Sequence, residues 1–233
     1  MTSIVLNAPG KNAISTALME RIQKEIAATN GGPILLRGSD GVFSAGMNLK
    51  EVAEKDEASM VDFLNLLEGT CKALFHHPGP TVAFVEGHAI AGGSILALCC
   101  DHVIAQDNPR ARIGLNEVAL GLRFPPRIFD MLRYRIPAAS INEVILHAGL
   151  HTPQEALRLG LVDQVSENAE AEAEALLKKL SALPPHAYAE SKSDLQQGVM
   201  DISEEVEAAF LAETVPRWVA PELKAMIRAM FGG

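Results

Sequence analysis

Residues 81–105 read TVAFVEGHAIAGGSILALCCDHVIA, and this stretch decides the fold. Its composition predicts, in order, a buried strand, a glycine loop, a short helix and a second strand, at residues 81–85, 87–93, 94–100 and 103–105. Just before it, an apolar run at 33–37 predicts another buried strand, and a glycine-punctuated loop follows at 38–46. Successive strand–loop–helix units are joined by crossovers, which favour parallel strands. We therefore expect an α/β fold.

Helical patterns surround these units. Apolar residues spaced three and four apart are typical of amphipathic helices and predict two of them, over 16–28 and 57–76. Beyond Pro126 the composition is helical to the end of the chain. In that part we expect a helix that begins at the capping box of Thr152, Pro153 and Glu155 and stops at Gly160, and exposed helices at 168–182 and 202–213.

The composition is that of an ordinary globular protein. The 233 residues are enough for one or two domains, with a hydrophobic fraction of 48% and a charged fraction of 21%. Lys and Arg number 20 against 29 Asp and Glu, which gives a formal net charge of −9. Sequence-independent affinity for nucleic acid comes mainly from clustered Lys and Arg, and no such cluster is visible. We expect no nucleic-acid partner.

Signals for export, membrane spanning and metal binding are missing from the sequence. The three cysteines are an odd number, and two of them are neighbours at 99 and 100, so no disulfide framework is readable. Residues 1–9 lack the pattern of a signal peptide, and no apolar run reaches about 18 residues. The histidines at 76, 77, 147 and 151 lack companions at ligand spacing. We expect a cytoplasmic protein without a metal or a membrane contact.

Two glycine loops present backbone amides at strand-to-helix junctions, FSAGMNL at 43–49 and AGGS at 91–94. Unpaired N–H groups at such junctions can bind anions. Because the loops follow consecutive parallel strands, we expect them at the same edge of the sheet, where their amides could converge on one oxygen atom as an oxyanion hole. An ordinary strand-to-helix turn is the alternative reading of each loop.

Glu117 is the third candidate feature. It lies in IGLNEVALGL at 113–122, a stretch that is otherwise uncharged. Apolar surroundings disfavour a charged carboxylate and raise its pKa, which suits a general base that works near neutral pH. The alternative is a surface or helix-capping glutamate without a catalytic role.

In this order and spacing, these segments resemble the crotonase superfamily, the enoyl-CoA hydratase/isomerase group, over nearly the whole chain. The segments that carry the resemblance are NAIS at 12–15, FSAGMNLKE at 43–51, GHAIAGG at 87–93, CD at 100–101, GLNE at 114–117 and TPQEALRLGLVD at 152–163.

The resemblance implies a spiral of ββα turns over residues 1–185, which carries an acyl-CoA site, and a helical C-terminal region of the same fold over 186–233. It implies an acyl-CoA thioester substrate, with coenzyme A as part of the substrate and no separate cofactor. Homotrimers or dimers of trimers are the implied assembly. By position in the motifs, the site residues are the amides of Met47 and Gly92 on the thioester oxygen, and Ala45, Leu49 and Lys50 along the adenine and phosphates of CoA.

The catalytic acid separates the activities within this group. Its hydratases use two glutamates, one at the position of Glu117 and one where this chain has Ile95, which can neither activate nor orient water. Its Δ3,Δ2-enoyl-CoA isomerases use a glutamate at the Glu117 position. The resemblance therefore favours an isomerase in which Glu117 moves a proton from C2 to C4 of a 3-enoyl-CoA. The alternatives are a hydratase or other crotonase-type enzyme, and a non-catalytic acyl-CoA-binding or scaffold subunit.

Overall fold

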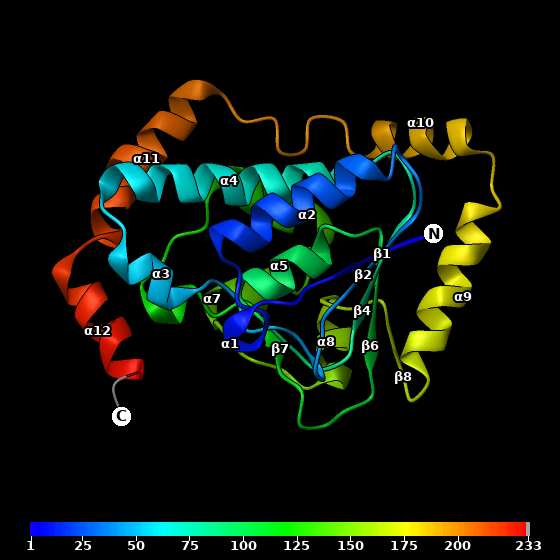
Figure 1. Ribbon diagram of the computed structural model, residues 1–233, viewed down its shortest axis with the longest axis horizontal. Helices are drawn as coiled ribbons and strands as arrows, with labels where there is room; N and C mark the ends of the chain where they lie inside the picture. The colour runs from blue at the N-terminus through cyan, green and yellow to red at the C-terminus, as the bar shows by residue number, and fades with distance from the viewer. Residues whose placement is uncertain (232–233) are drawn as a thin grey trace.

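Two parallel β-sheets form the centre of the protein, which a computed structural model describes for residues 1–231 (Figure 1). The larger sheet has the order β1-β2-β4-β6-β8, and its strands are Thr2–Val5, Ile34–Arg37, Thr81–Val85, His102–Gln106 and Gln164–Ser166. The smaller sheet has the order β3-β5-β7, and its strands are Val42–Ser44, His88–Ile90 and Ile113–Gly114. Every strand pair in both sheets is parallel, which confirms the expected α/β class.

Successive strands alternate between the two sheets, so the chain forms a spiral. β2 lies in the larger sheet and β3 in the smaller one, and the pairs β4–β5 and β6–β7 repeat this order. Helical segments follow each pair: α3 (Leu49–Glu54) and α4 (Glu57–Phe75) after the first, α5 (Gly92–Leu98) after the second, and the 3-10 turn η1 (Val118–Leu120) with α6 (Pro126–Arg135) after the third. Each ββα turn therefore adds one strand to each sheet.

Apolar periodicity positions the helices on the main core. In α2 (Thr16–Ala28), Leu18, Ile22 and Ile26 face inward, and the Ser15 side chain accepts a hydrogen bond from Leu18 N and caps the helix. α2 packs along α4, and the two helices run side by side in Figure 1. The predicted helices at 16–28 and 57–76 are thus confirmed to within one residue.

A second, smaller core lies on the other face of the larger sheet. Successive side chains of a strand point to opposite faces. In β4, Ala83 and Val85 accordingly pack in the main core, while Val82 and Phe84 contact α9 (Ala169–Ser181). The helix at 168–182 was expected to be exposed, and this expectation is wrong for one face, because Ala169, Ala173 and Leu177 are fully buried there. Its Ala- and Glu-rich composition hides this narrow apolar stripe.

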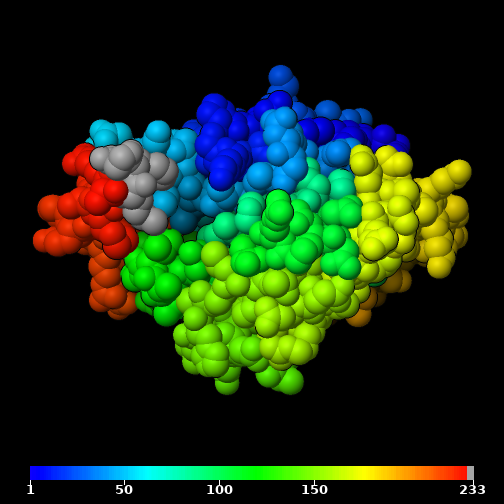
Figure 2. All heavy atoms as spheres, turned by 90° about the horizontal axis from the view of Figure 1, so that it is seen from below, coloured from blue at the N-terminus to red at the C-terminus, as the bar shows by residue number. Residues whose placement is uncertain are grey.

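The helices after the third turn cover two ends of the molecule. α9 and α10 (Pro185–Leu195) lie at one end, and α11 (Glu204–Trp218) with α12 (Pro221–Phe231) at the other (Figures 1 and 2). α11 packs on α4 and α6, and α12 packs on α3. The helix predicted at 202–213 was expected to be exposed, but it extends to Trp218 and buries Phe210, Val215 and Trp218. The remaining elements are α1 (Pro9–Asn12), α7 (Ile141–Leu146) and α8 (Pro153–Leu159).

Three short strands differ from the sequence-based expectation. β5 occupies part of the predicted loop at 87–93, and β3 part of the predicted loop at 38–46. β8 interrupts the region after Pro126 that was expected to be helical throughout. Each has only three residues, too few for a strand periodicity to emerge from the sequence. By contrast, α8 begins at the predicted capping box and ends at Gly160. No helix within the described residues is long and apolar enough to cross a membrane.

Candidate active site

The carboxyl edge of the smaller sheet brings the three candidate features together. β3 pairs with β5 through Ser44 and Ala89, and β5 pairs with β7 through Ile90 and Gly114. Because these strands are parallel, the segments that leave their carboxyl ends emerge at one edge. These segments carry the Met47 amide after β3, the Gly92 amide after β5 and the Glu117 side chain after β7.

The loop after β3 leaves the Met47 amide free. Ala45 N donates to Lys11 O at 3.0 Å, and Asn48 N donates to Ile14 O at 2.8 Å. Gly46 N donates to the Ser44 side-chain oxygen at 3.2 Å. The Met47 N–H, between these bonded groups, has no acceptor among residues 1–231. An unpaired backbone donor in an ordered loop is available to an incoming oxygen atom.

The turn after β5 leaves the Gly92 amide free in the same way. Ala91 N donates to Gly114 O at 2.8 Å, and Ala91 then adopts φ +51° and ψ −121°, a conformation that a non-glycine residue rarely takes. Gly92 is the first residue of α5, so its N–H has no acceptor within the helix. No other described residue accepts from this group.

Glycine allows the two loops to pack against each other. A Cβ atom added to Gly46, whose φ is +89°, would lie 2.8 Å from Ile90 O and 3.6 Å from Gly92 N. A Cβ atom added to Gly92 would lie 3.7 Å from Met47 N. The loops therefore touch through main-chain atoms, and the two unpaired amides belong to neighbouring segments.

Glu117 is a buried carboxylic acid without a protein partner. The residue is 4% exposed, and neither carboxylate oxygen has a hydrogen-bond partner in the described chain. Desolvation by burial raises the pKa of Glu117 from 4.5 to about 7. Its side chain makes no capping bond to η1, while its backbone carbonyl accepts from Leu120 N and Leu122 N and closes the turn. A surface or capping role for this side chain is therefore excluded.

Comparison with known proteins shows the family of the chain. Residues 1–213 match the family model for enoyl-CoA hydratase/isomerase. The chain belongs to that family. It is 31% identical over 172 residues to mouse mitochondrial enoyl-CoA delta isomerase 1, a match that covers 73% of this chain and 60% of the mouse protein. The chain thus spans less than two thirds of the length of the curated isomerases that it matches.

Solved structures of this family share the fold. The structure of human mitochondrial delta3-delta2-enoyl-CoA isomerase superposes with a TM-score of 0.89 at 25% identity, over 97% of this chain and 90% of the human chain. An enoyl-CoA hydratase from Bacillus halodurans gives a TM-score of 0.84 at 25% identity, over 97% of this chain and 95% of that chain. The fold alone therefore does not separate isomerase from hydratase.

The other predicted site residues share the Met47 loop or the helix beside it. Ala45 is the first residue after β3, and Leu49 is the first residue of α3, where it packs against the main core. Lys50 follows on α3 and is exposed. Asn48 caps this helix, because its side chain accepts from Glu51 N at 3.3 Å. Ala45, Leu49 and Lys50 thus form one continuous segment with Met47.

Ile95 lies in the first turn of α5, three residues after Gly92, and is 3% exposed. The position where the resemblance leads one to expect the hydratases' second glutamate therefore holds a buried alkyl side chain. Two further buried polar residues in these loops, Ser44 and Ser94, escaped the sequence analysis. A single serine in a glycine-rich loop carries no sequence signal that separates a buried hydroxyl from a solvated one.

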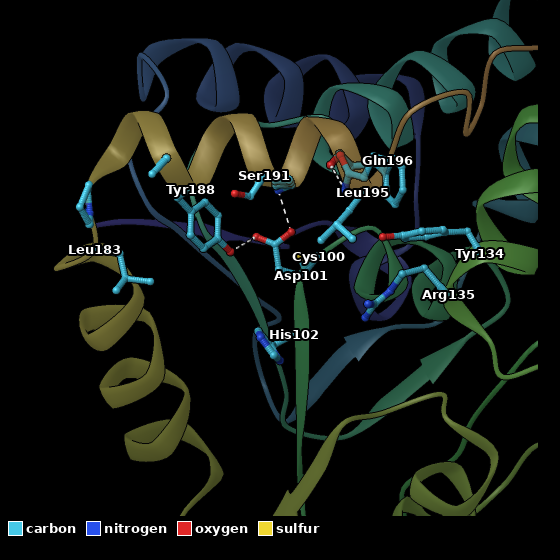
Figure 3. Close-up of a pocket in the computed structure, with 14 residues that line it drawn as sticks. Cys100, Asp101, His102, Tyr134, Arg135, Leu183, Tyr188, Ser191, Leu195 and Gln196 are labelled. Carbon is cyan, nitrogen blue, oxygen red and sulfur yellow. Dashed lines mark hydrogen bonds and ion pairs between the residues drawn. The ribbon is translucent and has the colours of Figure 1, made fainter.

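A separate cavity of about 530 Å³ lies beside α10 and contains none of the predicted site residues (Figure 3). Asp101 is one of its polar lining residues. The Asp101 carboxylate forms an ion pair with Lys192 at 2.7 Å and accepts hydrogen bonds from the Tyr188 hydroxyl at 2.9 Å and Thr81 N at 2.8 Å. These contacts fix α10 to the starts of β4 and β6. Because the charges are mutually paired, Asp101 has a structural role here.

Within the described chain, no group of three or more His, Cys, Asp or Glu side chains is arranged to hold a metal.

Proposed function

We propose that the protein is a Δ3,Δ2-enoyl-CoA isomerase. The Glu117 carboxylate removes a proton from C2 of a 3-enoyl-CoA, and the electrons pass into a dienolate whose charge lies on the thioester oxygen. The Met47 and Gly92 amides donate hydrogen bonds to that oxygen. The protonated Glu117 then returns the proton to C4, and the double bond between C3 and C4 becomes one between C2 and C3.

The observation that carries this proposal is the state of Glu117. Its pKa of about 7 leaves a useful fraction of the base ionised at neutral pH, and no protein group competes for its oxygens within the described chain. A positioned base of this kind contributes roughly 10²–10⁴ in rate. Each oxyanion donor contributes on the order of 3–4 kcal/mol of transition-state stabilisation.

Ile95 supports isomerisation over hydration. Hydration needs a second acid or base to activate water, and the buried Ile95 side chain has no proton to give or take. An apolar side chain beside the amides also lowers the local dielectric, which strengthens their interaction with a developing negative charge.

The segment that carries Met47 would also bind the CoA part of the substrate. In this proposal Ala45, Leu49 and Lys50 lie along the adenine and phosphates of CoA, and coenzyme A enters as part of the substrate with no separate cofactor.

We propose a cytoplasmic homotrimer or dimer of trimers, with residues 1–185 as the spiral core and 186–233 as a helical extension of the same fold.

A substrate panel tests the proposal. The protein is incubated with 3-hexenoyl-CoA and, separately, with crotonyl-CoA, and formation of conjugated 2-enoyl-CoA is followed against loss of the crotonyl double bond. Isomerisation of the first without hydration of the second is expected. Hydration of crotonyl-CoA without isomerisation of 3-hexenoyl-CoA would reject the isomerase in favour of the hydratase, the second candidate, which the likeness to the Bacillus halodurans hydratase favours.

The Glu117→Gln variant separates an enzyme from a binding subunit. Glutamine keeps the size of the side chain but cannot accept the proton, so the isomerase rate is expected to fall by about 10²-fold or more. Equal rates in the wild type and the variant would mean that the carboxylate is not the base. Binding of acyl-CoA without turnover in the wild type would indicate the non-catalytic alternative.

A further inference from the structure

We propose that two buried serine hydroxyls, Ser44 and Ser94, are positioning residues that hold the Met47 and Gly92 amides in place for the thioester oxygen. Neither side chain touches the reacting atoms in this scheme. Each acts through the loop that carries the amide. The inference rests on the proposed function in that it assigns both amides to the substrate carbonyl.

Ser44 fixes the Met47 loop from the end of β3. The residue is completely buried, and its hydroxyl donates to Asn12 O at 2.8 Å while it accepts from Gly46 N at 3.2 Å. The next amide along the chain is that of Met47. Two bonds constrain where the Met47 N–H points. Ile14 N donates to Gly46 O, in the same peptide group, at 2.8 Å, and the bond from Gly46 N to Ser44 holds the preceding peptide group of this glycine, whose φ is otherwise little restricted.

Asn12 anchors Ser44 in turn. This asparagine is 3% exposed, and its side-chain amide donates to Val42 O at 2.7 Å and Ser39 O at 3.1 Å. Its φ is +59°, a left-handed conformation that asparagine tolerates better than most residues. The carbonyl that accepts the hydrogen bond from the Ser44 hydroxyl therefore belongs to a residue whose side chain is held by two hydrogen bonds.

Ser94 fixes the Gly92 turn from the first turn of α5. The residue is 2% exposed, and its hydroxyl donates to Ala89 O at 2.6 Å and accepts from Gly114 N at 3.1 Å. These two groups lie on β5 and β7, which pair with each other. The hydroxyl thus ties the start of the helix to both strands. Together with the bonds from Ala91 N to Gly114 O and from Ile95 N to Ala91 O, it holds the turn that carries the Gly92 N–H.

The two serines also belong to one packed unit. A Cβ atom added to Gly93 would lie 2.7 Å from Ser44 O and 2.9 Å from the Ser44 Cβ atom. The end of β3 therefore packs directly against the residue between Gly92 and Ser94. A hydroxyl suits both positions because one small group both donates and accepts. Alanine at either position would leave a buried carbonyl and a buried amide without that link.

The test removes each hydroxyl alone. We expect Ser44→Ala and Ser94→Ala to lower kcat for isomerisation about tenfold each while KM changes less than about threefold, because a misplaced donor weakens transition-state binding more than substrate binding. The Cys variants at the same positions replace the hydroxyl with a slightly larger thiol that forms weaker hydrogen bonds, and their kcat values should be intermediate. Circular dichroism and Tm establish that each variant is folded.

Thr70→Val is the matched control. Thr70 is also completely buried, and its hydroxyl donates to Leu66 O at 2.7 Å and accepts from the Gln23 side chain at 3.0 Å, but it lies in the middle of α4. Its removal should lower Tm to a similar degree and leave kcat unchanged. An equal fall in kcat for Thr70→Val would show that general loss of stability, and not loop positioning, explains the serine effects.

A vibrational measurement detects hydrogen bonds from the two amides to a bound thioester without any turnover. Butyryl-CoA labelled with ¹³C at the thioester carbonyl cannot isomerise, and hydrogen bonds from the two amides should lower its C=O stretching frequency on binding. The downward shift should shrink in both Ala variants and stay complete in Thr70→Val. Folded Ala variants with the full shift and wild-type kcat would overturn the inference. If the Ala variants do not fold, the same wild-type values in both Cys variants would overturn it.

The same measurement separates this inference from the proposed function. A wild-type protein that shifts the carbonyl frequency but converts no 3-enoyl-CoA would contradict the isomerase proposal. The positioning role of the two serines would still be tested, by comparing the frequency shift in the serine variants with that in the wild type. A wild-type protein that turns over 3-enoyl-CoA but shows no shift would contradict the role of the amides, and the inference with it.

Discussion

Ala91 N donates a 2.8 Å hydrogen bond to Gly114 O, and this bond joins the turn that carries the Gly92 amide to the segment that carries Glu117. Gly92 is the next residue on one side, and Glu117 is three residues further on the other. The acid and one amide are thus fixed relative to each other by the backbone of two paired strands. A site built on strands holds its geometry better than one built on loops alone.

The raised pKa of Glu117 predicts how stability depends on pH. The pKa of Glu117 is about 7 in the folded protein and 4.5 in the unfolded chain. Its contribution to the free energy of unfolding is therefore fully present below pH 4.5 and is lost as the pH rises through 7. Over this interval the ionisation of Glu117 costs the folded state about 3 kcal/mol. Glu117→Gln should therefore stabilise the protein by about that amount at pH 8 and by much less at pH 4.5.

Urea unfolding of both proteins at the two pH values measures this difference. The comparison within each pH cancels the titration of the other carboxyl groups. A stability difference that is the same at pH 4.5 and pH 8 would show that Glu117 ionises normally in the folded protein.

The same pKa predicts the pH profile of catalysis. In the proposed mechanism Glu117 reacts as the ionised base, so kcat/KM for 3-hexenoyl-CoA should rise about tenfold per pH unit below pH 7 and level off above it. The midpoint reports the pKa of Glu117 in the free enzyme. Initial rates between pH 5 and pH 9 provide the measurement. A midpoint near 4.5 would contradict the buried, unpartnered carboxylate.

Comparing Gly46→Ala with Gly198→Ala should distinguish the effect of a clash between the two loops from the effect of backbone strain. Gly46 and Gly198 have φ values of +89° and +79°, so alanine is strained at both, by about 1–3 kcal/mol. Only at Gly46 does the added Cβ meet a neighbour, Ile90 O at 2.8 Å. We expect Gly46→Ala to lose at least about 10²-fold in kcat/KM and Gly198→Ala to keep the wild-type value. Matching activities in the two variants would contradict the packing of the two loops.

Asp101→Ala should destabilise the protein without altering the candidate site. The substitution leaves the buried Lys192 ammonium without its counter-charge and the Tyr188 hydroxyl without its carboxylate acceptor, and breaking such a buried pair costs about 3–5 kcal/mol. Glu143→Ala breaks the pair with Arg158, whose two charges are exposed and screened by water, and should cost much less. Urea unfolding measures both. Equal losses would mean that the Asp101 cluster is solvated like a surface pair.

The sequence was sufficient to predict those structural elements whose signal lies in neighbouring residues. The apolar run of β4, the periodicity of α2 and α4 and the capping box of α8 each depend on neighbouring residues, and the structure follows them closely. Glu117 was also found locally, because a lone acid in an apolar stretch predicts burial. Its burial and raised pKa are confirmed, while its catalytic role stays a prediction.

The features that escaped the sequence depend on distant partners. β3 and β5 are too short for periodicity and exist because each pairs with a neighbouring strand. The apolar stripe of α9 becomes visible only against β4 and β6. Ser44 and Ser94 acquire their roles from carbonyl and amide groups in other elements or turns.

Each of three successive ββα turns supplies one part of the candidate site: the Met47 amide, the Gly92 amide and the Glu117 acid. These parts are spread over 71 positions of the chain, from Met47 to Glu117. In the proposed mechanism, a folding intermediate with only two turns in place has no general base, so enzymatic turnover should appear only when the third turn has docked. During refolding, the return of activity should therefore require all three turns, and it should lag behind the recovery of helical structure.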